Sequence, residues 1–200
     1  MKKIPRFTLK KLKREDAQSA VARMLYEILR YRIKVKKQYN WKPEDEACAK
    51  NVIDRSLWTW SVGVTSDGKY EGNPVWSEGA LRSFKKWGKA ISSGNMSDSL
   101  RHEHVVPRAK LINYLFEKYE QKISYEDLFL DLKSKGIGAV VTKEEHSRLD
   151  DKNVDFNNVW KRYKDAGIKI VNHNFLDEET KQQLRDCGIL GIEIYADVQA

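Results

Sequence analysis

The segment GIGAVVTKEE, residues 136–145, constrains the fold of this chain more than any other part of the sequence. Its apolar run over 136–141 is short, contains two glycines and ends in two valines, as is typical of a buried strand. Thr142 and Glu145 follow with the spacing of a capping box, in which each side chain accepts a hydrogen bond from a backbone N–H at a helix start. The sequence therefore predicts a strand that passes into a helix at Thr142.

A second short strand is predicted over residues 100–106, whose sequence LRHEHVV stops at Pro107. Three of the four histidines of the chain therefore lie where strands and helices meet: His102 and His104 in this strand, and His146 in the helix after the other strand. Two strands and a helix that brings back a histidine form a small scaffold for a divalent cation. Carboxylate and imidazole donors suit Mg²⁺, Mn²⁺ or a later transition metal, whereas a site without cysteine is unlike most structural zinc sites.

The rest of the chain is predicted to be mostly helical, which makes the fold class α+β and helix-rich. Apolar residues recur at three- and four-residue steps, and helix-start residues precede several of these stretches. The predicted helices cover residues 16–37, 43–60, 77–90, 107–120, 125–133, 159–166 and 178–186. Residues 63–76 are predicted to form a loop or an irregular hairpin, Gly167 to end a helix before a short strand, and the polar segment 92–99 to separate two modules.

Positive charge is concentrated at the N-terminal end of the chain. The net charge is +8, but residues 1–42 hold 14 Lys and Arg against three acidic residues, whereas the remaining 158 residues hold 23 against 26. A local positive field attracts and holds polyanions, so a nucleic acid is the favoured partner and a membrane surface the less favoured one. The alternative is a solvated basic face that only keeps the protein soluble.

Composition favours a folded protein of the cell interior. The chain is 40% hydrophobic and 33% charged, which is ordinary for a globular protein, and no apolar run approaches the roughly 20 residues of a membrane-spanning helix. The basic N-terminus lacks the apolar segment of a signal peptide, so we expect a cytoplasmic location. Cys48 and Cys187 are far apart in the sequence and are expected to be free thiols.

The stretch EHVVP at 103–107, followed by TKEEHSRL at 142–149, resembles the HNH nucleases, the ββα-metal group. The first motif of that family has an acidic residue or a histidine next to a histidine, then two aliphatic residues and often a proline. The second motif places a histidine or an asparagine early in a helix. The resemblance covers roughly residues 99–165. It implies a ββα-metal core with one divalent metal ion, Mg²⁺ or Mn²⁺ first and another transition metal as the alternative.

The resemblance also implies roles for individual residues. His104 corresponds to the general base that takes a proton from water, a task that suits an imidazole with a pKa near ambient pH. Glu103 and His146 correspond to metal ligands, and Arg148, two residues later, to a catalytic residue beside the scissile phosphate. The middle asparagine of the family has no counterpart among residues 136–139.

The geometry of the first strand leaves two arrangements open. In a regular strand the side chains alternate between faces, which would place His102 and His104 together and Glu103 opposite. His102 would then be the ligand beside His104. An irregular strand end, such as a bulge near Pro107, would allow Glu103 and His104 to act side by side. We favour the irregular end, with Glu103 as ligand and His102 as a residue that supports a ligand or contacts substrate.

The sequence therefore predicts a metal-dependent HNH endonuclease that hydrolyses DNA and leaves 5′-phosphate and 3′-hydroxyl ends. It would have a basic helical region that contacts nucleic acid over residues 1–98, a catalytic core with a helical insertion over 99–175, and a C-terminal helix and tail over 176–200. The side chains expected to contact the DNA backbone are those of Lys10, Lys11, Lys13, Arg14, Arg30, Arg32, Lys34, Lys85 and Lys86. The partner is expected to be double-stranded DNA, with a homodimer as an option.

Two alternatives stay open beside the DNA endonuclease. One is a protein with an HNH-like fold that binds DNA or takes part in an assembly without cleaving, an option that the absent asparagine supports. The other is an HNH nuclease of the toxin type that cleaves RNA. Stand-alone nucleases of the family often belong to phages, mobile elements or defence systems.

Overall fold

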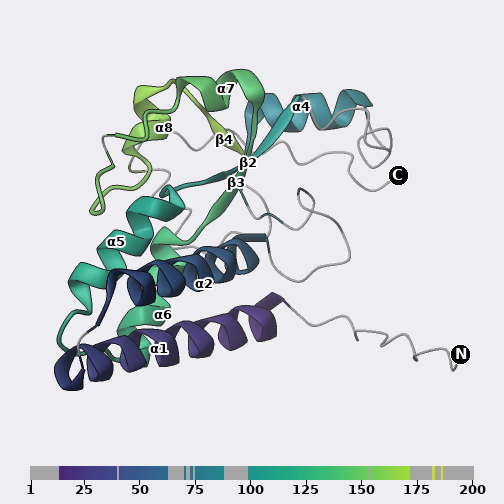
Figure 1. The fold of residues 1–200 in the computed structure, drawn as a ribbon. Helices are drawn as coiled ribbons and strands as arrows, with labels where there is room; N and C mark the ends of the chain where they lie inside the picture. The colour runs from purple at the N-terminus through teal and green to yellow at the C-terminus, as the bar shows by residue number, and fades with distance from the viewer. Residues whose placement is uncertain are drawn as a thin grey trace, which may run out of the picture.

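The computed structural model of the protein describes residues 14–39, 41–62, 70, 73, 75–87, 99–152, 154–171, 182 and 186. Within these residues the fold is α+β and helix-rich, with helices packed around a four-stranded mixed sheet. The elements follow in the order α1 (Arg14–Gln38), α2 (Pro43–Val62), β1 (Val75–Ser77), α4 (Glu78–Trp87), β2 (Leu100–His104), α5 (Arg108–Lys118), α6 (Tyr125–Lys135), β3 (Gly138–Thr142), α7 (Lys143–Arg148), α8 (Lys161–Asp165) and β4 (Ile170–Val171). Figure 1 shows α1 and α2 below the sheet and α4, α7 and α8 near its upper end.

The sheet has the strand order β2–β3–β1–β4, so β2 and β4 are its edge strands. β2 and β3 pair antiparallel, with Leu100 opposite Thr142 and His104 opposite Gly138. β1 pairs parallel with β3 and antiparallel with β4. β3 is buried from Gly138 to residue 141 because it has a neighbour on each side and side chains over both faces, which explains its continuous apolar run.

The central strand β1 lies at the end of the segment that the sequence predicted to be a loop or an irregular hairpin. Neither form describes Val75 and Trp76, which are buried and pair with Ala139 and Val140 of β3, a strand outside this segment. A strand of three residues is too short to show an alternating pattern, and the Gly, Asn and Pro before it dominate the local composition.

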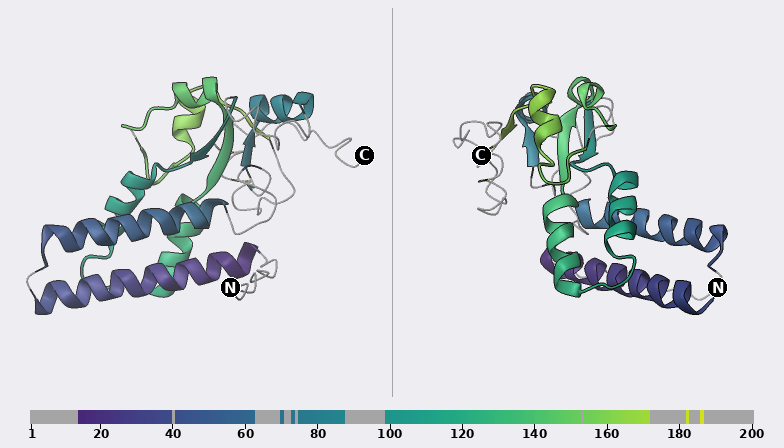
Figure 2. Two further views of the ribbon diagram at one scale, coloured as in Figure 1. Left: turned by 45° about the vertical axis from the view of Figure 1, so that its right-hand side comes forward. Right: turned by 90° about the vertical axis from the view of Figure 1, so that its left-hand side faces the viewer.

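Helices α1 and α2 form an antiparallel pair that lies against the rest of the core. Both views of Figure 2 show them side by side. Arg32 of α1 is buried in this region: its guanidinium donates hydrogen bonds of 3.1 and 3.2 Å to the two carboxylate oxygens of Glu46 and lies 4.0 Å from the ring centre of Phe116. Arg32 therefore joins elements inside the fold and is not available to a DNA backbone, in contrast to the expectation from the sequence.

The polar segment 92–99 does not separate two independent sheets. β1, which precedes this segment, lies between β3 and β4, which follow it. The main cluster of buried apolar side chains likewise includes residues of α1 and α2 together with residues of α5, α6 and β4. The regions before and after the segment therefore share one sheet and one core.

The other predicted elements mostly agree with the structure. The helices of the first half, the two helices between β2 and β3, and the passage from strand to helix at Thr142 are confirmed, with ends that differ by a few residues. Gly167 follows α8 with a φ of 64°, the left-handed conformation that favours glycine. Of the last predicted helix, 178–186, only Gln182 and Asp186 are described, and both are helical.

Cys48 is an exposed free thiol, as predicted, and Cys187 lies outside the described residues. None of the helices in the described part of the chain combines the length and the apolar character that crossing a membrane would need.

Candidate active site on the edge strand β2

The junction between β3 and α7 brings His146 to β2. Thr142 Oγ1 accepts a hydrogen bond of 3.1 Å from the Glu145 backbone N–H, and Glu145 Oε2 accepts one of 2.8 Å from the Thr142 backbone N–H, which completes the predicted capping box. The hydroxyl of Ser77 on β1 donates to the same carboxylate oxygen. α7 has only six residues, and so short a helix depends on such contacts for its stability.

β2 is regular over its whole length. Five consecutive residue pairs join it to β3 without a bulge. Side chains therefore alternate between the two faces of the sheet, and Glu103 lies on one face while His102 and His104 lie on the other. From the sequence we favoured an irregular end of this strand, and that expectation was wrong. The alternative, a regular strand, is confirmed.

On the first face, Glu103 lies between an imidazole and a guanidinium. Its Oε2 is 2.9 Å from His146 Nε2, and its Oε1 is 3.0 Å from Arg162 Nη1. Glu103 is only 8% exposed, whereas the side chain of His146 is 46% exposed. Solvent therefore reaches this pair of side chains mainly at the histidine.

Arg162 of α8 holds both Glu103 and the end of β2. Its Nη1 also donates hydrogen bonds of 3.2 Å to the backbone carbonyl groups of His104 and Val105, and its Nη2 pairs with the carboxylate of Asp151. The arginine is buried, and a buried cation is stable only when it is paired and hydrogen-bonded in this way. Arg162 is therefore the centre of the charged cluster on this face.

The charge of Glu103 depends on its positive neighbours. Burial raises the pKa of the Glu103 carboxyl above its ordinary value, and the carboxylate of Asp151 raises it further. The guanidinium of Arg162 and the imidazole of His146 act in the opposite direction. Removal of Arg162 would therefore favour the protonated form of this carboxyl.

Glu103 and His146 fit a divalent ion that keeps much of its water. Mg²⁺ in particular is often held by one or two carboxylates together with water and substrate phosphate, and Mn²⁺ accepts both carboxylate and imidazole donors. No group of three or more His, Cys, Asp or Glu side chains in the described part of the chain is arranged to bind a metal. These residues can therefore form an open site with two protein ligands, and not a closed structural site.

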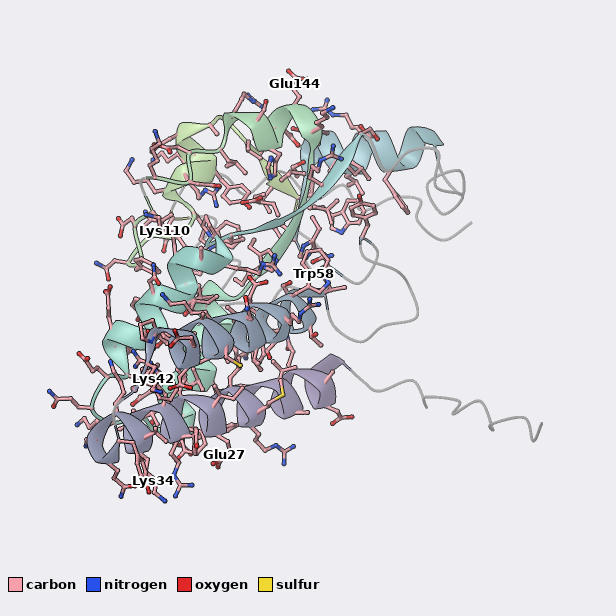
Figure 3. The ribbon with its side chains drawn as sticks, viewed as in Figure 1. Glu27, Lys34, Lys42, Trp58, Lys110 and Glu144 are labelled. Carbon is pink, nitrogen blue, oxygen red and sulfur yellow. The ribbon has the colours of Figure 1, made fainter. Side chains whose placement is uncertain are left out.

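On the second face, His102 and His104 pack against Trp58 of α2. The ring centres of the two histidines are 4.9 Å apart, and the Trp58 ring centre is 4.8 Å from that of His102 and 5.7 Å from that of His104. Figure 3 shows Trp58 at the end of α2 that meets the sheet. Burial, His102 and the nearby guanidinium of Arg108 lower the pKa of His104 from 6.5 to about 3, so this imidazole is neutral at pH 7.

The structure does not bring His104 together with Glu103 and His146. His104 projects from the opposite face of β2. A general base acts best when its pKa is near the working pH, and a pKa of about 3 makes His104 a weak base. Neither its position nor its pKa matches the role that the resemblance implies.

Arg148 and Lys143 flank His146 on α7. Arg148, the last residue of the helix, is exposed, but residues two apart on a helix do not face each other. Lys143 lies three residues before His146 and is also exposed, so it is on the same side of the helix as the imidazole. Lys143 is therefore better placed than Arg148 to meet a phosphate bound at His146.

The residues predicted to contact nucleic acid are described only in part. Arg30 and Lys34 are exposed on α1, where Arg30 lies 3.5 Å from Glu27, and Figure 3 shows Lys34 and Glu27 on the side of α1 turned away from α2. The remaining ones cannot be placed as side chains: Lys10, Lys11 and Lys13 lie outside the described residues, and for Arg14, Lys85 and Lys86 only the helical backbone is described.

Sequence reasoning missed Arg162, Asp151 and Trp58. The stretch WKRYKD gives Arg162 the appearance of an ordinary helical arginine, and its carboxylate and carbonyl partners on β2 are far away in the sequence. Two buried aromatic neighbours, Trp160 and Tyr163, are the only local sign that this turn of the helix faces the core. That sign marks a buried turn but not its ion pairs.

Comparisons of the chain with protein-family models, with curated proteins and with solved structures find no match. The function is therefore inferred from the side chains around β2 and from the resemblance of their motifs.

Proposed function

We propose that this protein is a metal-dependent endonuclease of the HNH type, with Glu103 and His146 as its metal ligands. The 2.9 Å contact between Glu103 Oε2 and His146 Nε2 carries the proposal. These are the two residues for which the resemblance implies metal binding, and they come from elements separated along the chain by two helices and a strand. Two side chains that share a metal ion must lie this close together. The local sequence around either residue does not by itself bring the two side chains together.

The charges on this face of β2 suit phosphodiester hydrolysis. Glu103 and His146 would hold a divalent ion, which would supply a Lewis acid for the phosphate and lower the pKa of a bound water. Arg162 keeps Glu103 oriented and favours its charged form. His146 and Lys143 are both exposed on α7, so a nucleic acid strand has access to them, and the lysine offers positive charge to a phosphate oxygen.

His104 has no proton-transfer role in this proposal. It lies on the face of β2 opposite Glu103, and its pKa of about 3 makes it a poor proton acceptor at neutral pH.

The N-terminal charge supports nucleic acid as the substrate. Residues 1–42 carry all of the positive excess of the chain, and Arg30 and Lys34 of this segment are exposed. Lysine and arginine hold a phosphate backbone without regard to its sequence, because they release condensed counterions. These contacts would therefore position DNA on the protein and would not select a recognition sequence.

Cleavage of supercoiled plasmid in Mg²⁺ or Mn²⁺ tests the proposal. The wild-type chain is expected to nick or cut the plasmid, and a chelator to stop it. Glu103→Gln and His146→Ala are each expected to lower the rate by roughly 100-fold or more, while DNA binding stays within a few-fold. Glu144→Gln is the matched control, since Glu144 is exposed on α7 and points away from the sheet (Figure 3). Wild-type rates in both site variants would contradict the proposal.

A DNA-binding protein without cleavage is the second candidate. Arg162 holds one oxygen of Glu103, and the described residues offer no third His, Cys, Asp or Glu ligand; both observations favour this option. Such a protein would shift DNA in a gel and leave the plasmid intact with every metal. Duplex DNA, single strands and RNA offered to one preparation would also separate a DNase from an RNase of the toxin type.

A further inference from the structure

The outer side of α1 is a surface that the proposed cleavage site does not use. α1 packs against α2 and α6, and Figures 1 and 2 show it at the end of the molecule opposite to α7, which carries His146. Glu27 and Lys34 lie on the side of α1 turned away from α2 (Figure 3). A partner bound on this outer side would therefore lie away from the Glu103–His146 pair.

Tyr31 presents an aromatic ring on this side of α1. Of the two aromatic residues of α1, Tyr26 packs against the core, whereas Tyr31 is 63% exposed. Tyr31 makes no hydrogen bond and no ring contact with the described residues. Its neighbours on the helix surface are Glu27, four residues before it, and Lys34, three residues after it. The ring is therefore available to a partner.

A row of basic side chains runs beside Tyr31. Arg23, Glu27, Arg30 and Lys34 follow one another at steps of four, three and four residues, so they form one line on the helix surface. All four are exposed, and the line is about 16 Å long at the rise of an α-helix. Glu27 is its only acid, and the 3.5 Å contact of Glu27 with Arg30 is between two well-exposed side chains, so it is easily exchanged for another partner. The line therefore attracts an anionic partner.

This combination of charge and apolar area suits a nucleic acid strand better than a protein surface. Met24 and Tyr31 are the large apolar side chains exposed on the described part of α1, and they are two helical turns apart. A stable protein interface needs a continuous buried core of apolar contacts, which two separate side chains do not supply. A single nucleic acid strand needs only cations for its phosphates and an aromatic ring for a base.

We infer that the outer side of α1 binds single-stranded nucleic acid, with Tyr31 stacked on an unpaired base and Arg23, Arg30 and Lys34 on the phosphates. The inference rests on the proposed function for nucleic acid as the partner, but not for cleavage. Within a duplex each base is stacked between its neighbours, so an aromatic side chain on a helix surface has no base face to contact. The partner must therefore contain an unpaired segment.

Binding of a labelled single-stranded oligonucleotide, measured by fluorescence polarisation with a chelator present to prevent cleavage, tests the inference. Tyr31→Ala is expected to weaken binding at least about fivefold, because a base loses its stacking contact. The slope of log K against log salt should stay the same, since the substitution removes no positive charge. Tyr31→Phe, which keeps the ring, is expected to bind as the wild type does.

Tyr39→Ala is the matched control for loss of an exposed tyrosine. Tyr39 follows α1 and is 70% exposed, and its substitution is expected to leave the affinity at the wild-type value. Because Tyr31 and Tyr39 are both exposed, neither variant should change the thermal unfolding temperature. Wild-type affinity in Tyr31→Ala would overturn the inference. So would equal losses in Tyr31→Phe and Tyr31→Ala, or a wild-type chain that does not bind the oligonucleotide.

A duplex of the same sequence separates base stacking from phosphate contacts. Tyr31→Ala is expected to bind the duplex within about twofold of the wild type, and an equal loss on duplex and single strand would overturn the stacking. Lys34→Gln is expected to lower the salt slope for the single strand by about 0.7, and an unchanged slope would overturn its phosphate contact. Because these measurements exclude cleavage, a failure of the nuclease proposal would appear in the plasmid assay and not in these affinities.

Discussion

A single guanidinium, that of Arg162, holds together the charged face of β2. It pairs with Glu103 and Asp151 and binds two backbone carbonyl groups at the end of the strand. Arg162→Met is expected to lower the free energy of unfolding by about 3–5 kcal/mol, because it removes the buried cation that pairs with the Glu103 carboxylate and leaves this carboxylate with the half-exposed imidazole of His146. Urea unfolding measures this change.

The double variant Arg162→Met/Glu103→Gln is the control for that prediction. The loss in Arg162→Met is attributed to the charge of Glu103, which Arg162 no longer balances. If this is correct, the double variant should be at least about 1 kcal/mol more stable than the sum of the losses in the two single variants predicts. Strict additivity of the two substitutions would show that Arg162 stabilises the fold in some other way.

His104 should give the stability of the protein a dependence on pH. The pKa of this imidazole is about 3 in the folded chain, against an ordinary value of 6.5. Below pH 6.5 the unfolded chain therefore binds a proton that the folded chain does not bind until about pH 3, and acidification through this window favours unfolding. The free energy of unfolding is expected to fall by up to about 1.4 kcal/mol per pH unit. Urea unfolding of the wild type and of His104→Leu tests this, since a slope of the same size in both proteins would refute it.

At the scale of the elements, the capping box at Thr142 connects stability to function. Thr142→Ala removes the hydroxyl that accepts the Glu145 N–H and is expected to destabilise the protein by about 1 kcal/mol. Because α7 carries His146, plasmid cleavage should also fall. Ser124→Ala is the matched control: Ser124 caps α6 through the N–H of Asp127 at 3.0 Å, so it should cause a similar loss of stability without a loss of cleavage. Equal cleavage in the two variants would contradict this link.

Elements with a signal in their own sequence could be predicted, and contacts between distant elements could not. The capping box needs only four consecutive residues, so the start of α7 was predictable. The side chain directions of His102 and His104 depend on the register of β2 against β3, which neither strand specifies alone. The ion pairs of Arg162 depend on the packing of α8, for which the local sequence has no pattern.

At the scale of the whole molecule, β1 makes residues 99–200 dependent on the residues before them. β1 separates β3 from β4, and without it β3 has no partner on one side. A fragment of residues 99–200 is therefore expected to lack a cooperative thermal transition by circular dichroism, and co-expression with residues 1–98 to restore one. A fragment that unfolds cooperatively alone would contradict the shared sheet.

Salt dependence of DNA binding tests the role of the basic N-terminus. Replacing Lys10 and Lys11 by Gln is expected to weaken binding and to reduce the slope of log K against log salt by about 0.9 for each lost phosphate contact. Lys110→Gln, at an exposed position of α5 (Figure 3), is the control for loss of positive charge elsewhere. An unchanged slope in the double variant would show that these lysines do not touch DNA.

The central position of β1 also bears on how the chain reaches its native state. Val75 pairs with Ala139 and Trp76 with both Val140 and Val171, so the middle of the sheet forms only when distant parts of the chain meet. Contacts of such long sequence separation slow folding. Until they form, one side of β3, whose residues 139–141 are all apolar, can pair with another molecule. Newly made chains should thus aggregate more readily at high concentration, and rapid docking of α4 and β1 would protect them.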